Sequence, residues 1–254
     1  MIEAVSYALL CGFALSAVLV PLTALAMRRA TGLGGATRHM IWFMALLSTV
    51  AATVAAFAVS IVRPAQQLSG TVVPAAPVPA AAGAAAVPLA ALCAVFLACW
   101  LIVSFARTIL IARRVAALRA MKHRATPMDF GCDLPRGART LASESCVPAA
   151  VGFLHPAILL PAGAIEALDP ADARQIVLHE AAHLRRRDDL TGLVFLLCAA
   201  LLWFNPFVHY IGKKLSLECE IACDDIVIEK SGDAVRYATL LFEIAESSAG
   251  TGPQ

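Results

Sequence analysis

The chain has 254 residues, of which 60% are hydrophobic, and its mean hydropathy is +0.77. These values exclude an ordinary soluble domain as the whole of the chain. The first 128 residues hold ten Lys or Arg and one acidic residue, a net charge of +9, whereas residues 129–254 hold ten basic and 17 acidic residues, a net charge of −7. We therefore predict a membrane domain with basic flanks, followed by a mixed-charge domain that holds the acidic chemistry.

The eight cysteines do not have the spacing of a disulfide framework or of a Cys₄ zinc site, because no CxxC pair occurs. Cys219 and Cys223 are four residues apart in a predicted helix, and we interpret them as packing residues. Four other cysteines lie in apolar runs, where cysteine behaves as a small hydrophobic residue: Cys11, Cys93, Cys99 and Cys198.

Three apolar segments are long enough to cross a membrane. Residues 4–27 and residues 40–62 contain no charged residue, and a helix of this length spans a hydrocarbon core of ~30 Å. Residues 89–111 carry a single charge, Arg107, near their end, where its long side chain can reach the interface. Between the second and third segments, residues 64–88 contain five prolines, and we predict a Pro/Ala-rich external loop there.

Basic residues flank these segments unevenly. The chain is rich in arginine after the first and third spans, whereas the loop between the second and third contains only Arg63. The positive-inside rule then predicts a multi-pass protein of a bacterial-type cytoplasmic membrane, with its N-terminus outside. We predict a membrane domain over residues 1–112, a cytoplasmic-facing domain over residues 113–246 and a flexible tail over residues 247–254.

The second half begins with a small predicted β element. Residues 139–161 mix short apolar runs with Pro and Gly, as short strands and turns do, and a strand edge there could accept an extended peptide. A helix is predicted over residues 170–187. Asp169 is its expected N-cap, and Asp172 stands at the capping-box position.

This predicted helix contains the sequence HEAAH, from His179 to His183. Histidines four residues apart project from the same face of a helix, so both imidazoles can bind one metal ion, and Zn²⁺ favours such nitrogen ligands. Glu180 stands beside the first ligand, where a carboxylate can take a proton from the attacking water. We predict His179 and His183 as ligands of one Zn²⁺ and Glu180 as the catalytic base. The alternative is a solvated helix with two unrelated histidines.

A third metal ligand is predicted in the sequence SLECEIACDDIVIEK. Glu220 and Asp224 are four residues apart, on one face of a helix. We predict Glu220 as the third ligand and Asp224 as the acceptor for the outer nitrogen of a ligating histidine. Glu218 and Asp225 are expected to be solvated. The alternative for the whole segment is an ordinary acidic helix face.

An apolar segment, residues 190–213, separates the histidines from Glu220. If it crossed the membrane once, Glu220 would lie ~30 Å away on the other side, which a Zn–O bond of about 2 Å excludes. We therefore predict a re-entrant or interfacial hairpin that turns at Asn205-Pro206. Four residues are candidates for stabilising the transition state: His209, Tyr210, Arg236 and Tyr237.

Four sequence motifs occur in a fixed order: VGFLHPAILLP, HEAAHLRRRDD, LLWFNPFVHY and EIACDD. Over about residues 110–245 the chain resembles the membrane-bound zinc metallopeptidases of the BlaR/MecR type, the β-lactam sensor–transducers and their relatives. The resemblance implies a mainly α membrane protein, with three transmembrane helices and a cytoplasmic-facing gluzincin-like domain. It also implies zinc on His179, His183 and Glu220, with Glu180 as the base, and cleavage of cytoplasmic proteins such as repressors.

Sensor–transducers of this type continue into a further span and an extracellular penicillin-binding domain, whereas the sequence given ends at Gln254. We expect either a fragment or a signal that enters by another route. The expected function is a membrane-bound zinc metalloendopeptidase in signal transduction. Its expected partners are a protein substrate, which a transcriptional repressor would satisfy, and the lipid bilayer. We expect no direct nucleic-acid binding, and a homo-oligomer is compatible with this expectation. Two alternatives stay open: an HtpX-like or prenyl-protein quality-control peptidase, and a non-catalytic transducer with a structural zinc site.

Overall fold

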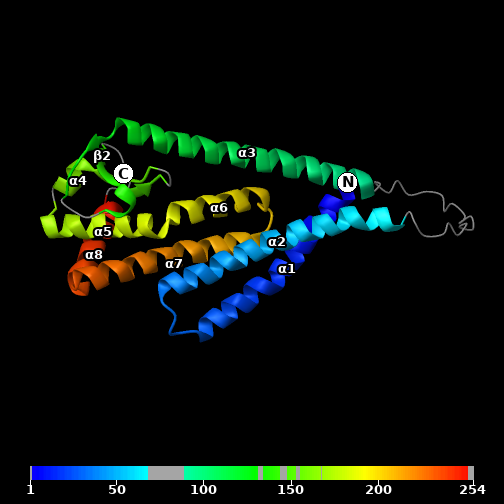
Figure 1. Ribbon diagram of the computed structural model, residues 1–254, viewed down its shortest axis with the longest axis horizontal. Helices are drawn as coiled ribbons and strands as arrows, with labels where there is room; N and C mark the ends of the chain where they lie inside the picture. Colours follow the sequence, from blue (N-terminus) through cyan, green and yellow to red (C-terminus); the bar gives the residue numbers. More distant parts are fainter. Residues whose placement is uncertain are drawn as a thin grey trace, which may run out of the picture. The chain divides into compact units, whose positions relative to one another are not determined.

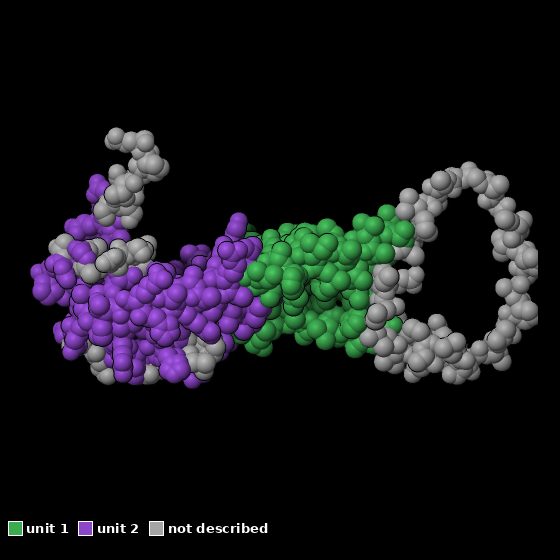
Figure 2. All heavy atoms as spheres, turned by 90° about the horizontal axis from the view of Figure 1, so that it is seen from above, with its two compact units in different colours: residues 1–31, 42–109, 198–211 green, residues 32–41, 110–197, 212–254 purple. Residues whose placement is uncertain are grey.

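The computed structural model is mostly helical and, in the part of the chain that it describes, carries one small sheet (Figure 1). The chain forms two compact units (Figure 2). The first comprises residues 1–31, 42–109 and 198–211, and the second comprises residues 32–41, 110–197 and 212–254. The structure describes residues 2–67, 89–130, 134–143, 148–152, 155–166 and 168–250.

Three long helices have the length and composition to cross a membrane, as predicted. They are α1 (Ile2–Arg29), α2 (Gly35–Gln67) and α3 (Leu89–Arg124). Their apolar windows have mean hydropathies of 2.2, 2.0 and 2.2. Large apolar side chains are exposed along them, and Ile102 and Phe105 in α3 are each 69% exposed. Such surfaces suit helices surrounded by lipid.

Helices α2 and α3 are longer than the segments predicted from charge. Helix α2 continues through Pro64 to Gln67, into the segment predicted as a loop, and α3 continues past Ile111 to Arg124. Charged side chains end an apolar segment but do not end a backbone helix, which explains the difference. The rest of the predicted loop, residues 68–88, lies outside the described residues.

The apolar segment 190–213 forms a helical hairpin of α6 (Asp188–Leu201) and α7 (Pro206–Ser231) (Figure 1). Asn205 is 1% exposed and caps α7, because its Oδ1 accepts from Phe207 N at 3.0 Å. Its Nδ2 donates to Ser16 Oγ of α1 at 2.9 Å. Pro206 occupies the first helical position, where its missing N–H costs no hydrogen bond. The turn of the hairpin thus lies at Asn205-Pro206.

The second unit contains a four-stranded sheet with the strand order β1-β2-β4-β3. Strands β2 and β4 are parallel, and the other two pairs are antiparallel. Ile158, Leu159 and Leu160 of β4 are completely buried, as expected for a central strand covered on both faces. The elements of this region are β1 (Thr126–Pro127), a 3₁₀ turn (Pro135–Gly137), β2 (Arg139–Ser143), β3 (Ala149–Val151), β4 (Ala157–Pro161) and α4 (Ala162–Glu166).

Helix α5 (Pro170–Arg186) has the predicted start and ends within one residue of the predicted end. The side chain of Asp169 accepts from Ala171 N at 2.8 Å and caps the helix. Arg187 closes the other end in the left-handed conformation, with φ of 59°, and its N–H bonds to carbonyls of the last turn. The single left-handed residue ends α5, and the next helix, α6, begins directly after it at Asp188.

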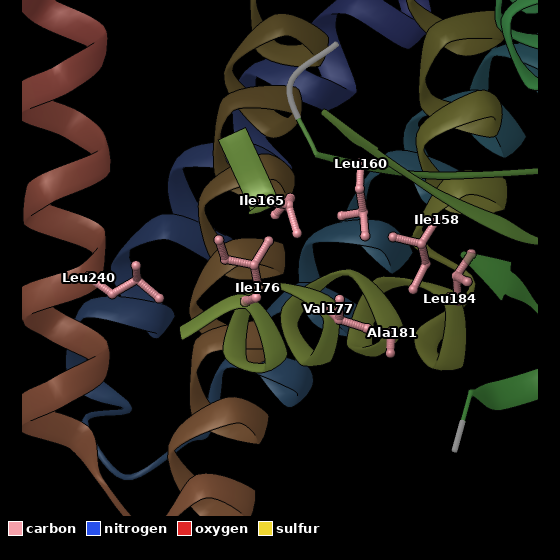
Figure 3. Close-up of a cluster of buried hydrophobic side chains, with 9 residues drawn as sticks. Ile158, Leu160, Ile165, Ile176, Val177, Ala181, Leu184 and Leu240 are labelled. Atoms are coloured by element: carbon pink, nitrogen blue, oxygen red, sulfur yellow. The ribbon is translucent and has the colours of Figure 1, made fainter. Parts of the chain in front are cut away.

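A buried cluster fixes the rotation of α5 about its axis (Figure 3). Ile176, Val177, Ala181 and Leu184 occupy one face of α5, at the spacing of an amphipathic helix. They pack with side chains of β4 and with Leu240 of α8 (Ala234–Gly250). Helix α8 continues four residues into the segment predicted as a tail, and residues 251–254 lie outside the described residues.

Candidate metal centre

Helices α5 and α7 bring the three predicted ligands together. The Nε2 atoms of His179 and His183 are 3.2 Å apart. Glu220 places Oε2 at 3.4 Å from Nε2 of His179 and Oε1 at 3.8 Å from Nε2 of His183. A tetrahedral zinc ion with bonds of about 2.0–2.1 Å holds neighbouring N and O ligands about 3.4 Å apart. The donor types and their separations therefore fit one zinc ion.

The three ligands differ in exposure. The side chains of His179 and His183 are 16% and 17% exposed, whereas that of Glu220 is 55% exposed. The site is therefore open to solvent on the side of Glu220. This opening leaves room for a water molecule or a substrate group beside the three ligands, as catalytic zinc sites require.

Glu180 lies on the buried side of α5 and is 8% exposed. Burial raises the pKa of its carboxyl, whereas His183 and His179 act in the opposite direction. The backbone N–H of Ala150, in β3, also donates to this carboxylate. A carboxyl whose pKa is raised toward neutrality suits a group that accepts a proton and later returns it.

The outer nitrogen of His179 faces a tyrosine and a carboxylate. Nδ1 of His179 lies 2.9 Å from the hydroxyl of Tyr237 and 3.2 Å from Oδ1 of Asp224. The tyrosine hydroxyl donates to the same Asp224 oxygen at 2.7 Å. Burial and the Asp224 carboxylate raise the pKa of Tyr237 well above its ordinary value. These partners hold the ring so that Nε2 points at the predicted metal position.

The outer nitrogen of His183 faces Asp188, a residue that the sequence analysis missed. Nδ1 of His183 lies 3.0 Å from Oδ2 of Asp188, which also accepts from Arg186 Nε at 3.1 Å. Burial opposes protonation of His183, but the hydrogen bonds with Asp188 and Cys219 and the nearby Glu180 carboxylate together raise the pKa of this histidine to about 10. Burial acts against ionisation of Asp188 as well, but its hydrogen bonds lower the pKa of this carboxyl to about 2. In the sequence, Asp188 is one of several neighbouring charged residues, and nothing marks it as a partner of His183. The left-handed conformation of Arg187 turns the chain so that Asp188 lies beside His183 of α5.

Three of the four candidates for transition-state stabilisation have other partners. His209 bonds to the carbonyl of Trp203 at 2.8 Å, in the turn of the hairpin. The ring of Tyr210 stands edge-on to Trp42, with centroids 5.8 Å apart. Arg236 binds two carboxylates at the start of α5, about 10–15 Å along the helix axis from His179. The fourth candidate, Tyr237, contacts the predicted ligand His179 on the side of the ring away from the predicted metal position.

The expectation that Glu218 is solvated is wrong, whereas Asp225 is exposed as expected. Glu218 is 1% exposed, and its Oε1 lies 2.9 Å from Nη2 of Arg38 at the start of α2. The face of α7 that carries Glu218 is covered by α2, which the spacing of acidic residues could not reveal. Glu220, the predicted third ligand, is the glutamate that lies beside the histidines.

Comparison with known proteins places the chain in a family context. The pattern of the family described as BlaR1 peptidase M56 matches residues 8–253. The regulatory protein BlaR1 of Bacillus licheniformis is 34% identical over 82 residues, which are 32% of this chain and 14% of that protein. The methicillin resistance mecR1 protein of Staphylococcus aureus (strain Mu50) is 26% identical over 98 residues, 38% of this chain and 17% of that protein. The aligned part thus spans less than a fifth of either relative.

Proposed function

Since this chain belongs to the M56 family of BlaR1 peptidases, a family of membrane metallopeptidases, we propose that it is a zinc metalloendopeptidase that cleaves a cytoplasmic or membrane-proximal protein during signal transduction. One observation carries the proposal: two imidazoles and a carboxylate converge beside a buried glutamate on the same helix. The names of the relatives, a regulatory protein and a methicillin resistance protein, support a role in signalling.

His179, His183 and Glu220 would hold the zinc ion. When bound there, Zn²⁺ would polarise the scissile carbonyl and increase the acidity of the attacking water. Glu180 would accept the proton of that water and pass it to the leaving amine, and its buried position favours such an exchange. Asp188 and the Tyr237–Asp224 pair would keep the two imidazoles in the tautomer and orientation that binding needs.

Strand β3 offers a place for an extended substrate. It stands at one end of the described strand order, and the N–H of its Ala150 already binds the Glu180 carboxylate. A peptide that adds to this edge would pass the catalytic glutamate with its backbone held by hydrogen bonds. The edge thereby supports an endopeptidase, because an extended chain can continue past the site in both directions.

The catalytic site is proposed to face the cytoplasm. The last turn of α3 is basic, with Lys122, His123 and Arg124, and the positive-inside rule assigns such segments to the cytoplasmic side. Fusion of a periplasm-dependent phosphatase after Arg124 should give an inactive enzyme, and fusion after Gln67 an active one. An active fusion after Arg124 together with an inactive fusion after Gln67 would show that the topology is the reverse of the one proposed.

The buried Glu180 also favours a catalytic zinc site over the alternative of a purely structural one, because a structural site needs no base beside the metal. The family match favours a signalling peptidase over the HtpX-like alternative.

The test uses the full chain purified in detergent and a library of unstructured peptides. Glu180→Gln should keep about one equivalent of zinc in the His–His–Glu site but lose cleavage by about 10²-fold or more. The control Glu166→Gln, at an exposed position in α4, should cleave normally. Cleavage by Glu180→Gln at the wild-type rate would overturn the proposed function.

A further inference from the structure

A second group of potential ligands lies on the other side of His183. It consists of Nδ1 of His183, the carboxylate of Asp188 and the thiols of Cys219 and Cys223, and all four ligand atoms lie within 4.8 Å of one another. Cys223 Sγ is 3.3 Å from Nδ1 of His183, and Cys219 Sγ is 3.6 Å from the same nitrogen. The two cysteines, which the spacing suggested as packing residues, thus face a histidine and a carboxylate.

The separations match a tetrahedral site. Bonds of about 2.3 Å to sulfur and about 2.0–2.1 Å to nitrogen or oxygen place S and N ligands, and S and O ligands, about 3.6 Å apart. They place N and O ligands about 3.4 Å apart. The observed values are 3.3 and 3.6 Å for S to N, 3.6 Å for Cys223 Sγ to Asp188 Oδ2, and 3.0 Å for His183 Nδ1 to that same oxygen. A cation could enter with small movements of the side chains.

Burial gives a second, independent indication. Cys223 is completely buried, and the side chain of Asp188 is 8% exposed. Oδ1 of Asp188 is buried without a hydrogen-bond partner among the described residues. An unsatisfied carboxylate oxygen in a buried position is costly, and a cation beside the carboxylate would offset this cost.

From this geometry we propose that His183 Nδ1, Asp188, Cys219 and Cys223 form a second metal site, which takes a thiophilic divalent cation such as Zn²⁺ or Cd²⁺. Two sulfur ligands and an imidazole select such cations over Mg²⁺, Ca²⁺ or Mn²⁺, which prefer oxygen. The site shares only His183 with the predicted catalytic set: Nε2 of the ring faces His179 and Glu220, and Nδ1 faces the thiols. A cation on Nδ1 would displace the proton that this nitrogen donates to Asp188, and with zinc on Nε2 as well the ring would bind both cations as an imidazolate.

The test reads metal binding alone, so it stands or falls independently of peptidase activity. The full chain in detergent is reduced, stripped of metal with a chelator and titrated with Cd²⁺, while the ultraviolet charge-transfer absorption of cadmium thiolates is recorded. Wild type should bind about two cations per chain and show this absorption. The double variant Cys219→Ser, Cys223→Ser should bind about one and lose it, whereas Glu220→Ala should keep it.

Cys99→Ser, at an exposed cysteine of α3, is the matched control and should behave as wild type. A second measurement needs no variant: Cd²⁺ should protect Cys219 of wild type, the more accessible of the two thiols, from alkylation, as read by peptide mass spectrometry, and leave Cys99 reactive. Absorption that survives in the double variant, or alkylation of Cys219 at the same rate with and without Cd²⁺, would overturn the second site.

Discussion

His183 is the residue on which the candidate centre depends most, because each ring nitrogen has its own partners. Nε2 lies beside His179 and Glu220, and Nδ1 lies beside Asp188. The orientation of the His183 ring, and with it the geometry of the His179–His183–Glu220 site, therefore depends on the carboxylate of Asp188, five residues further along the chain. Tyr237 and Asp224 do the same for His179, from two other helices. Both imidazoles are thus oriented from behind by hydrogen bonds.

Replacing Asp188 by Asn tests this coupling at the level of one residue. The amide is similar in shape but uncharged, so it holds the imidazole less firmly, and zinc affinity of the His–His–Glu site should fall about 10–100-fold. Competition with a chromophoric chelator measures this affinity, in the Cys219→Ser, Cys223→Ser background so that only one site is read. Asp225→Asn, at an exposed position of α7, should leave it unchanged. Equal affinities for Asp188→Asn and its parent would show that Asp188 does not orient His183.

At the level of elements, the centre depends on how α7 packs, because α7 carries Glu220, Asp224 and both cysteines. The start of α2 approaches the backbone of α7 closely. A Cβ added at Gly35 would lie 2.8 Å from the backbone N of Ala222. Arg38, one turn further along α2, pairs with the buried Glu218. The first turn of α2 therefore holds α7 at the position that brings Glu220 to the histidines.

Gly35→Ala should push these two helices apart. We expect a loss of stability of about 1–3 kcal/mol, as for other overpacking changes, together with weaker zinc binding. Thermal unfolding in detergent and the zinc competition assay provide the two measurements. Gly34→Ala is the control, because a Cβ at Gly34 meets nothing within 4 Å. If both variants unfolded at the same temperature as wild type, the close approach of α2 would not hold α7.

Helix α8 is joined to the start of α5 by Arg236, which binds Asp169 and Asp172 at 2.8 and 2.6 Å. The N–H of Ala171, and then Arg236, lower the pKa of Asp169 from 3.8. Its stabilising contribution is therefore present above pH 3.8 and is lost as pH falls through the lowered folded value. Arg236→Ala should unfold at a slightly lower temperature than wild type at pH 7. The difference between the two unfolding temperatures should shrink as the pH falls below 3.8, because Asp169 then becomes protonated. A difference that grows in acid would contradict this assignment, and Lys213→Ala, exposed in α7, is the control.

At the scale of the whole molecule, features encoded within one segment could be predicted from the sequence. The start of α5 follows from its N-cap Asp169, and the three apolar helices follow from the lengths of their apolar segments. The turn at Asn205-Pro206 followed from the distance that a metal site allows. The contacts of Asp188, Glu218 and the two cysteines Cys219 and Cys223 could not be predicted in this way. They depend on a left-handed residue at Arg187 and on which helix covers each face of α7, and both are properties of tertiary packing.

The central claim is that His179, His183 and Glu220 form an open, catalytic zinc site. Calorimetric titration of the zinc-loaded protein with a peptide hydroxamate, which needs a free coordination position, tests it most directly. The account predicts about one hydroxamate bound per chain, retained in Cys219→Ser, Cys223→Ser and lost in Glu220→Ala. Zinc-loaded protein that binds no hydroxamate, or Glu220→Ala protein that binds it as wild type does, would contradict the claim.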